Sequence, residues 1–345
     1  MAASSKDKDF SAYGGNIEAA KAVGAAVAKK ALEKGIQKKS ERKGWPIHLR
    51  MLSGPNGGQW FFMGEKMAEI LTTELLPTSC RIGGGLANID NVGKKNADIA
   101  FTLGCFLGAS STEDNSSINI KNVSVLARVY PQVMYFLVRQ DFAKKHRIDS
   151  VEALLKKKMR LRFASLRPGT ASEFLLRILL NHGYKTDFQK LKAQGWDIVF
   201  NNYAETADNF AAGKLDCFAY TAGTDVPLIH TIEKHAEVTI LPIDKKVLET
   251  LAQQFNTGAY LIKKGDYKSV QAPIFTLGDF TCLIVRRDLP NDLVGKITQT
   301  LWENKKKIAG VIVDFNGLSP KTAIMKNFPM HPGALKFWRS LGSKR

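Results

Sequence analysis

The chain has 345 residues, enough for two domains, and its hydrophobic content of 44% is normal for a globular protein. The formal net charge is +18, of which +5 lies in residues 1–46, with ten Lys and Arg against five Asp and Glu. No uninterrupted apolar run approaches the length of a transmembrane helix, which argues against a membrane span.

Residues 1–46 form a basic extension with a partly helical pattern. In residues 16–39, Ile17, Val23 and Val27 fall near helical spacing, with lysines opposite. Two interpretations stay open: a helix on the domain surface, which the alanine and valine face favours, or an amphipathic tail that meets a membrane or a partner. Residues 1–43 lack the apolar segment of a signal peptide, so the chain either stays in the cytoplasm or is a mature or trimmed form.

A strand, a glycine-rich turn and a helix open the globular part. Residues 47–52 have strand character, the turn contains Gly54, Gly57 and Gly58, and a helical pattern begins at Gln59 or Trp60. Such a unit points unpaired backbone N–H groups and the positive end of a helix at one spot. It predicts half of a binding site for a small anionic solute.

Two further strands, near residues 80 and 98, follow with a helix between them, so the pattern is β-α-β-α-β and favours parallel strands. The carboxyl ends of the three strands carry Gly57-Gly58, Gly83-Gly84-Gly85 and Gly104. Ligands of such sheets bind beyond these ends. Three glycine turns at one edge indicate that the backbone comes close to a ligand there.

A second unit of the same kind lies further along the chain. Residues 159–164 are expected as a strand, residues 165–169 as a turn, and residues 170–182 as a helix. The segment Thr170-Ala171-Ser172-Glu173 is a capping box that places two hydroxyl groups at the helix start. Residues 198–201 and 217–220 are expected as strands of the same lobe, and residues 293–308 as a late helix.

The pattern predicts two α/β lobes behind the N-terminal extension. Residues 123–130 and 133–139 are expected as two strands separated by Pro131, with residues 276–286 as their partner. The chain is expected to leave lobe one near Pro131 and to return near Phe280. Lobe one would then hold residues 47–132 and 280–345, and lobe two residues 133–279.

Several chemistries find no support in the sequence. The glycine turns are followed by neither a GK[ST] nor a dinucleotide fingerprint, and H-E-x-x-H and G-x-S-x-G are missing. The segment 230–235 is interpreted as surface rather than a metal site, and His331 as a turn residue. The four cysteines lie in apolar runs and are interpreted as buried free thiols. A single disulfide bond between two of them remains an alternative. No catalytic residue, metal or cofactor is predicted.

Three arginines can each pair with a carboxylate. Arg128 and Arg139 lie on the expected hinge strands, where an ion pair is the plain interpretation, while Arg167 lies beside the second glycine turn and is the better ligand candidate. Trp60 and Tyr130 are either pocket walls or core.

A series of motifs occurs in order along residues 47–340. They are Gly57-Gly58-Gln59-Trp60-Phe61, Gly83-Gly84-Gly85-Leu86-Ala87-Asn88, Ala97-Asp98-Ile99-Ala100-Phe101, Ala127-Arg128-Val129-Tyr130-Pro131, Phe136-Leu137-Val138-Arg139, Pro168-Gly169-Thr170-Ala171-Ser172-Glu173, Gly213-Lys214-Leu215-Asp216-Cys217-Phe218 and His331-Pro332-Gly333-Ala334. Taken together, these motifs resemble the TAXI family of solute receptors that serve TRAP transporters.

The resemblance implies a type II periplasmic-binding (Venus-flytrap) fold that closes on a small carboxylate, such as glutamate or a related acid. It also implies an extracytoplasmic location and delivery of the solute to TRAP membrane subunits, and we expect a monomer. Carried over by position, the pocket consists of Gly57, Gly58, Gln59, Trp60, Gly84, Gly85, Asn88, Tyr130, Gly169, Thr170, Ala171 and Ser172. Arg167 completes the set of candidate ligand residues.

Two other classes of function remain as alternatives. One is an enzyme or sensor that acts on a small anion in a two-lobed cleft, although the cleft segments offer no nucleophile–base pair. The other is a basic protein associated with nucleic acid, although no stripe of aromatic and basic residues and no zinc-finger or helix-turn-helix pattern appears. The sequence favours a receptor that is not an enzyme and binds no nucleic acid.

Overall fold

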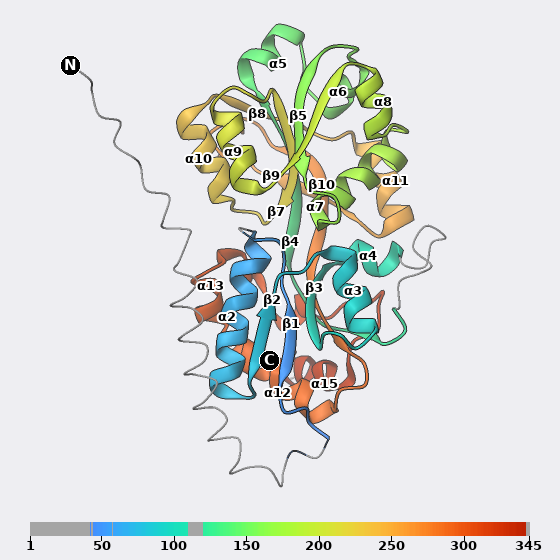
Figure 1. The fold of residues 1–345 in the computed structure, drawn as a ribbon, viewed down its shortest axis with the longest axis vertical. Helices are drawn as coiled ribbons and strands as arrows, with labels where there is room; N and C mark the ends of the chain where they lie inside the picture. Colours follow the sequence, from blue (N-terminus) through green and yellow to red (C-terminus); the bar gives the residue numbers. More distant parts are fainter. Residues whose placement is uncertain (1–41, 43, 57, 110–119, 343–345) are drawn as a thin grey trace, which may run out of the picture.

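The structure is a computed structural model that describes residues 42, 44–56, 58–109 and 120–342. The helix expected in residues 16–39, most of the basic extension and Gly57 therefore lie outside the described residues. The described chain forms two α/β lobes, one above the other in Figure 1. The predicted two-lobed α/β architecture is confirmed.

Lobe one contains three parallel strands. β1 (Leu49–Leu52) lies between β2 (Thr78–Arg81) and β3 (Ile99–Leu103) and pairs in parallel with both. The helices α2 (Gln59–Glu74), α3 (Gly85–Gly93) and α4 (Gly104–Ala109) each follow one of these strands, with α2 and α3 on opposite faces of the sheet (Figure 1). The glycine turns at the carboxyl ends therefore share one edge, as predicted.

Lobe two repeats this plan. β5 (Leu161–Leu166) lies between β6 (Trp196–Asn201) and β7 (Cys217–Ala222), again in parallel. The remaining elements of this lobe are α5 (Gln140–His146), α6 (Val151–Lys156), α7 (Ala171–Ile178), the π-helix η4 (Leu179–Gly183), α8 (Phe188–Ala193), α9 (Tyr203–Ala211), α10 (Pro227–His235), β8 (Val238–Ile240), α11 (Lys245–Phe255) and β9 (Gly258–Ile262).

Two long antiparallel strands join the lobes. β4 (Val123–Arg139) and β10 (Ile274–Arg286) pair along most of their length, and the whole sheet has the order β2-β1-β3-β10-β4-β7-β5-β6. β8 pairs with β4, and β9 pairs with β10. Pro131 lies opposite Phe280, so the two predicted crossing points face each other. The exact lobe boundaries stay a prediction.

The expected break of the hinge strand at Pro131 is wrong, because β4 runs through it. Proline removes only its own N–H donor. The neighbouring residues Tyr130 and Gln132 keep their partners, Thr281 and Asp279, on β10. Pairing on both sides therefore holds the proline inside one continuous strand.

The C-terminal segment returns to lobe one as α12 (Asn291–Glu303), α13 (Lys305–Ala309), the 3₁₀ helix η5 (Val313–Gly317), α14 (Pro320–Ala323) and α15 (Pro332–Gly342). The single helix expected over residues 293–308 is wrong, because it breaks at Asn304. The Asn304 amide donates to Glu74 on α2 and to the carbonyl of Thr300. The contact with Glu74 on α2 holds Asn304 in place, at the position where the helix is interrupted.

The helix expected over residues 170–182 also differs, since its regular part ends at Ile178 and continues as the π-helix η4. All four thiols are free. The interpretation as buried thiols is confirmed for Cys105, Cys217 and Cys282, whereas Cys80 is only partly buried.

Candidate functional site

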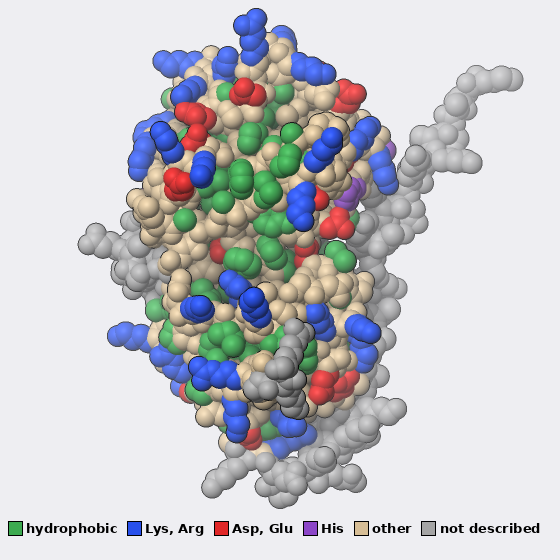
Figure 2. All heavy atoms as spheres, turned by 180° about the vertical axis from the view of Figure 1, so that it is seen from behind, with side chains coloured by type: hydrophobic (Ala, Val, Ile, Leu, Met, Phe, Trp, Pro, Cys, Tyr) green, Lys and Arg blue, Asp and Glu red, His purple; other side chains and the backbone are tan. Residues whose placement is uncertain are grey.

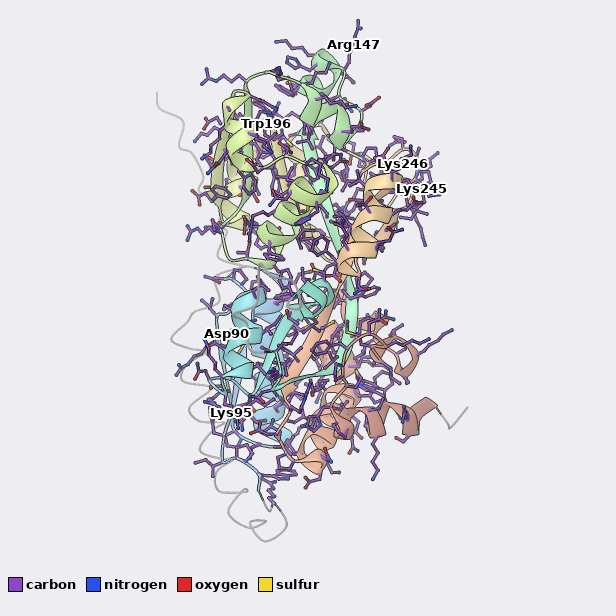
Figure 3. All side chains as sticks on the ribbon, turned by 90° about the vertical axis from the view of Figure 1, so that its right-hand side faces the viewer. Asp90, Lys95, Arg147, Trp196, Lys245 and Lys246 are labelled. Atoms are coloured by element: carbon purple, nitrogen blue, oxygen red, sulfur yellow. The ribbon has the colours of Figure 1, made fainter. Side chains whose placement is uncertain are left out.

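The lobes meet at the carboxyl ends of their parallel strands, a region that we call the junction. A Cβ atom built on Gly84 would lie 3.0 Å from the carbonyl oxygen of Gly169, and one on Gly85 would lie 3.3 Å from the Cα of Ala171. The starts of α3 and α7 therefore come together from opposite lobes. In Figure 3, Lys95 lies at the end of lobe one that is far from this contact.

Aromatic side chains also meet across the junction. The rings of Phe106 on α4 and Phe174 on α7 are 4.5 Å apart at 87°, an edge-to-face pair. On the other side, a Cβ atom on Gly58 would lie 3.3 Å from the ring of Tyr203. These contacts show that the two lobes are closed on each other.

Gln59 is a predicted site residue whose side chain bonds across the junction. Its Oε1 accepts a hydrogen bond of 2.8 Å from the backbone N–H of Gly223 in lobe two. Its Nε2 donates to Asp314 of η5 at 3.2 Å. Gln59 thus connects the glycine turn of lobe one to the end of β7.

Asn88 is fully buried and holds the turns of lobe one together. Its Nδ2 donates to the carbonyl groups of Ser53 and Phe101, at 2.9 and 2.8 Å, and its Oδ1 accepts from the N–H of Gly84 at 2.9 Å. This one side chain joins the segments that follow β1 and β2 to the middle of β3. Its polar groups are therefore occupied within lobe one.

Trp60 and Tyr130 lie in the core of lobe one. Trp60 stacks on Phe101 with 5.8 Å between ring centroids, and its Nε1 donates to Thr281 at 2.9 Å. Tyr130 is fully buried, and its hydroxyl has no hydrogen-bond partner among the described residues. Burial raises the pKa of Tyr130, which keeps this phenol neutral.

The start of α7 carries two hydroxyl groups with different roles. Thr170 is the N-cap, and its Oγ1 accepts from the N–H of Glu173 at 3.2 Å. The other half of the capping box is not formed, because Glu173 pairs with Arg177 and Gly169 instead. Ser172 accepts from the N–H of Thr221 at 2.7 Å, so it binds α7 to β7.

Of the three candidate arginines, only Arg167 has a guanidinium group without a partner among the described residues, and it is exposed next to the junction. Arg139 pairs with Asp141 at 3.3 Å. The ion pair expected for Arg128 is wrong: this side chain lies over the ring of Phe280 and donates to the carbonyl of Thr322.

Sequence reasoning missed three residues of the junction. Tyr203 follows β6, and its hydroxyl donates to the carbonyl of Thr221. Its position at the carboxyl end of a parallel strand was a usable signal. Thr224 and Asp314 meet across the junction, with the Thr224 N–H 3.0 Å from Oδ1 of Asp314. Asp314 carried no local signal, because the fold alone brings residues 90 positions apart into contact.

The junction contains a buried carboxyl group. Burial raises the pKa of Asp314, against the hydrogen bonds from Thr224 and Gln59. Among the predicted site residues, Arg167 is the single cation. An anion bound between the lobes would therefore rely on Arg167 and on the first backbone N–H groups of α2, α3 and α7, which have no partner within their own helices.

The rest of the surface offers weaker sites. A hollow of about 300 Å³ at the outer end of lobe two is lined by Gln140, Lys144 and Arg147 among others, and a smaller one lies between Leu248 and Phe275. Lys and Arg side chains are scattered over both lobes on the face in Figure 2 rather than gathered in one patch.

The described residues contain no group of three or more metal-ligating side chains. Every described helix is too short or too polar to cross a membrane.

A search of curated proteins gives short matches to large ribosomal subunit protein uL18. The proteins of Clostridium botulinum and Clostridium beijerinckii are 60% identical over 52 residues and 69% identical over 36 residues. These matches cover 15% and 10% of this chain and 44% and 30% of the relatives, so the chain spans less than half the length of these relatives. They do not bear on the two-lobed body as a whole.

Solved structures with a similar fold include MatC from Rhodopseudomonas palustris with bound malate, at 14% identity and a TM-score of 0.49, covering 87% of this chain and 97% of MatC. Another is an amino-acid ABC transporter substrate-binding protein from Streptococcus pneumoniae bound to L-arginine, at 16% identity and 0.40, covering 83% of this chain and 96% of that protein. At sequence identities this low, the ligands of these proteins cannot be assigned to this chain.

A family model, in contrast, matches almost the whole described body. The match runs over residues 51–342, from β1 to the end of α15, and includes both lobes and the junction. This chain belongs to the NMT1-like family.

Proposed function

We propose that the protein is a solute-binding receptor of the TAXI type that captures a small carboxylate between its lobes. The solute would be a glutamate-like amino acid, a dicarboxylate or a 2-oxo acid. The receptor works outside the cytoplasm as a monomer, without cofactor or metal, and delivers the solute to the membrane subunits of a TRAP transporter. The lobes are residues 47–132 with 280–345, and residues 133–279.

The observation that carries the proposal is the convergence of helix starts from both lobes at the junction. Gly84 and Gly85 begin α3, Gly169 and Ala171 lead into α7, and these segments lie so close that a Cβ atom on either α3 glycine would touch the backbone of the other lobe. Helix N-termini attract carboxylates through free N–H groups and the helix dipole. A solute that contacts both lobes only when they are closed stabilises the closed state.

A thermal-shift screen tests this function. The panel holds dicarboxylates, amino acids and 2-oxo acids, with malate and arginine included because two similar structures contain them. We expect one member to raise the melting temperature and to remain unconsumed when the sample is followed by NMR. Consumption of the solute would support the enzyme alternative, and no shift with any member would contradict the receptor.

Arg167→Ala then tests the site. Loss of the guanidinium group is expected to raise the Kd of the solute by roughly tenfold, the effect of one lost charge-assisted hydrogen bond. Arg160→Ala is the matched control, because Arg160 is also exposed in lobe two but lies before β5, at the opposite end of that strand. Equal Kd values for both variants in calorimetry would remove Arg167 from the site.

A further inference from the structure

One polar cluster at the junction joins the lobes through side chains, apart from the contact between the starts of α3 and α7. Asp314 of η5, in lobe one, accepts from the backbone N–H of Thr224 at 3.0 Å and also from the Thr224 hydroxyl. Asp314 is 9% exposed, so these hydrogen bonds are shielded from water.

Gln59 completes the cluster from the start of α2. Its Nε2 donates to Oδ2 of Asp314, which fixes the amide, and its Oε1 then accepts from the N–H of Gly223. Three hydrogen bonds therefore cross from lobe two to two side chains of lobe one. All acceptor positions belong to Gln59 and Asp314.

Gly223 shows how tightly this contact is built. A Cβ atom at this position would lie 2.1 Å from Oδ2 of Asp314 and 2.9 Å from Nε2 of Gln59, both in the other lobe. Its φ is not in the left-handed region, so the backbone itself accepts alanine. The need for glycine thus comes from the opposite lobe rather than from the local turn.

We propose that Gln59 and Asp314 form a latch that sets the balance between open and closed lobes. Gly223 and Thr224 donate the hydrogen bonds that this latch accepts from lobe two. Gln59 and Asp314 are positioning residues: they hold lobe two against lobe one and are distinct from the starts of α3 and α7, where the solute is proposed to bind. The proposal rests on the lobe closure proposed above. Its readout needs no solute, so a failure to find a ligand and a failure of the latch are distinguishable.

Amide hydrogen exchange of the ligand-free protein, followed by NMR, tests the latch directly. In Asp314→Ala, the N–H of Thr224 loses its acceptor, and the Gln59 amide that accepts from Gly223 loses the carboxylate that fixes it. Both N–H groups are therefore expected to exchange about tenfold faster or more. The N–H of Thr221 donates to Ser172 within lobe two and is expected to keep its exchange rate. Unchanged exchange at Gly223 and Thr224 would overturn the proposal.

Gly223→Ala gives a second test that leaves the interior of each lobe unchanged. The added methyl group is expected to hold the lobes apart and to increase the radius of gyration in small-angle X-ray scattering. Gly317→Ala is the matched control, because a Cβ atom there meets nothing within 4 Å. If Asp314→Ala fails to fold, this pair decides: equal radii for the two glycine variants and the native chain would overturn the latch.

Discussion

Asp279 is a buried carboxyl group in the strand pair that joins the lobes. It lies opposite Gln132, is 3% exposed, and its Oδ2 accepts from the N–H of Cys105 at 2.9 Å. Burial raises the pKa of Asp279 from its ordinary value of 3.8 to about 6, against the hydrogen bonds from Cys105 and Phe280. The native state therefore holds the proton more tightly than the unfolded chain.

This shift predicts a pH-dependent stability. Between pH about 4 and 6 the unfolded carboxyl is ionised while the native one takes up a proton, so the contribution of Asp279 is present at low pH and is lost as the pH rises through about 6. Asp279→Asn removes this titration. We compare the free energy of unfolding of this variant with that of the native chain at each pH. The difference is expected to shift in favour of the variant by on the order of 2–3 kcal/mol between pH 4 and pH 7.

Urea unfolding across this pH range measures the effect. The exposed Asp208→Asn on α9 serves as the control for the loss of one negative charge. A difference between Asp279→Asn and the native chain that stays constant from pH 4 to 7 would contradict the buried, proton-binding carboxyl.

At the level of elements, one arginine–aspartate bracket occurs in each lobe. Arg50, the second residue of β1, binds Asp98, which directly precedes β3, through its N–H, Nε and Nη2 at 2.8–3.0 Å. Arg162, the second residue of β5, binds Asp216 before β7 through the same three groups. Both brackets join the amino ends of two parallel strands, at the edge away from the junction.

We expect the two brackets to stabilise the lobes unequally. Asp98 also accepts from Arg286 on β10, so Asp98→Asn weakens contacts to two arginines and Asp216→Asn to one. Because Arg50 and Arg162 are about 40% exposed, screening limits each loss to roughly 1–3 kcal/mol.

Urea unfolding is expected to rank the free energy of unfolding as native, then Asp216→Asn, then Asp98→Asn, while the affinity for any solute found in the thermal-shift screen stays unchanged. The reverse order of the two variants would show that the contact with Arg286 contributes nothing. A loss of affinity at constant stability would place the brackets in the binding site instead.

For the whole molecule, the central question is whether the lobes are closed before solute binds. Phe106 and Phe174 lie in opposite lobes, so their coupling reports closure in solution. A double-mutant cycle with Phe106→Leu and Phe174→Leu is expected to give a coupling energy of about 0.5–1.5 kcal/mol in urea unfolding without solute.

The pair Phe188 and Phe200 is the matched control, since it is edge-to-face at 5.3 Å within lobe two. If that pair keeps its coupling while Phe106 and Phe174 show none, the free protein is open and the closed state requires solute. Coupling in both cycles agrees with a latch that holds the lobes together.

The sequence by itself determined the units from which the molecule is built. Apolar strands that end in glycine turns and capped helices are local patterns, and they located β1, β3, β5 and β7 and the helix starts at Gln59, Gly85 and Thr170 to within a few residues. Parallel pairing follows from alternating strands and helices, so the common edge of the glycine turns was also predictable.

Only the tertiary structure decided which side chains face the junction. Trp60, Asn88 and Ser172 turned out to bond within their own lobes, and Thr224 and Asp314 joined the site from segments with no local signal. The direction of a side chain and its distant partner depend on packing between segments up to 255 residues apart, as for Gln59 and Asp314. No pattern in a short stretch of sequence carries that information.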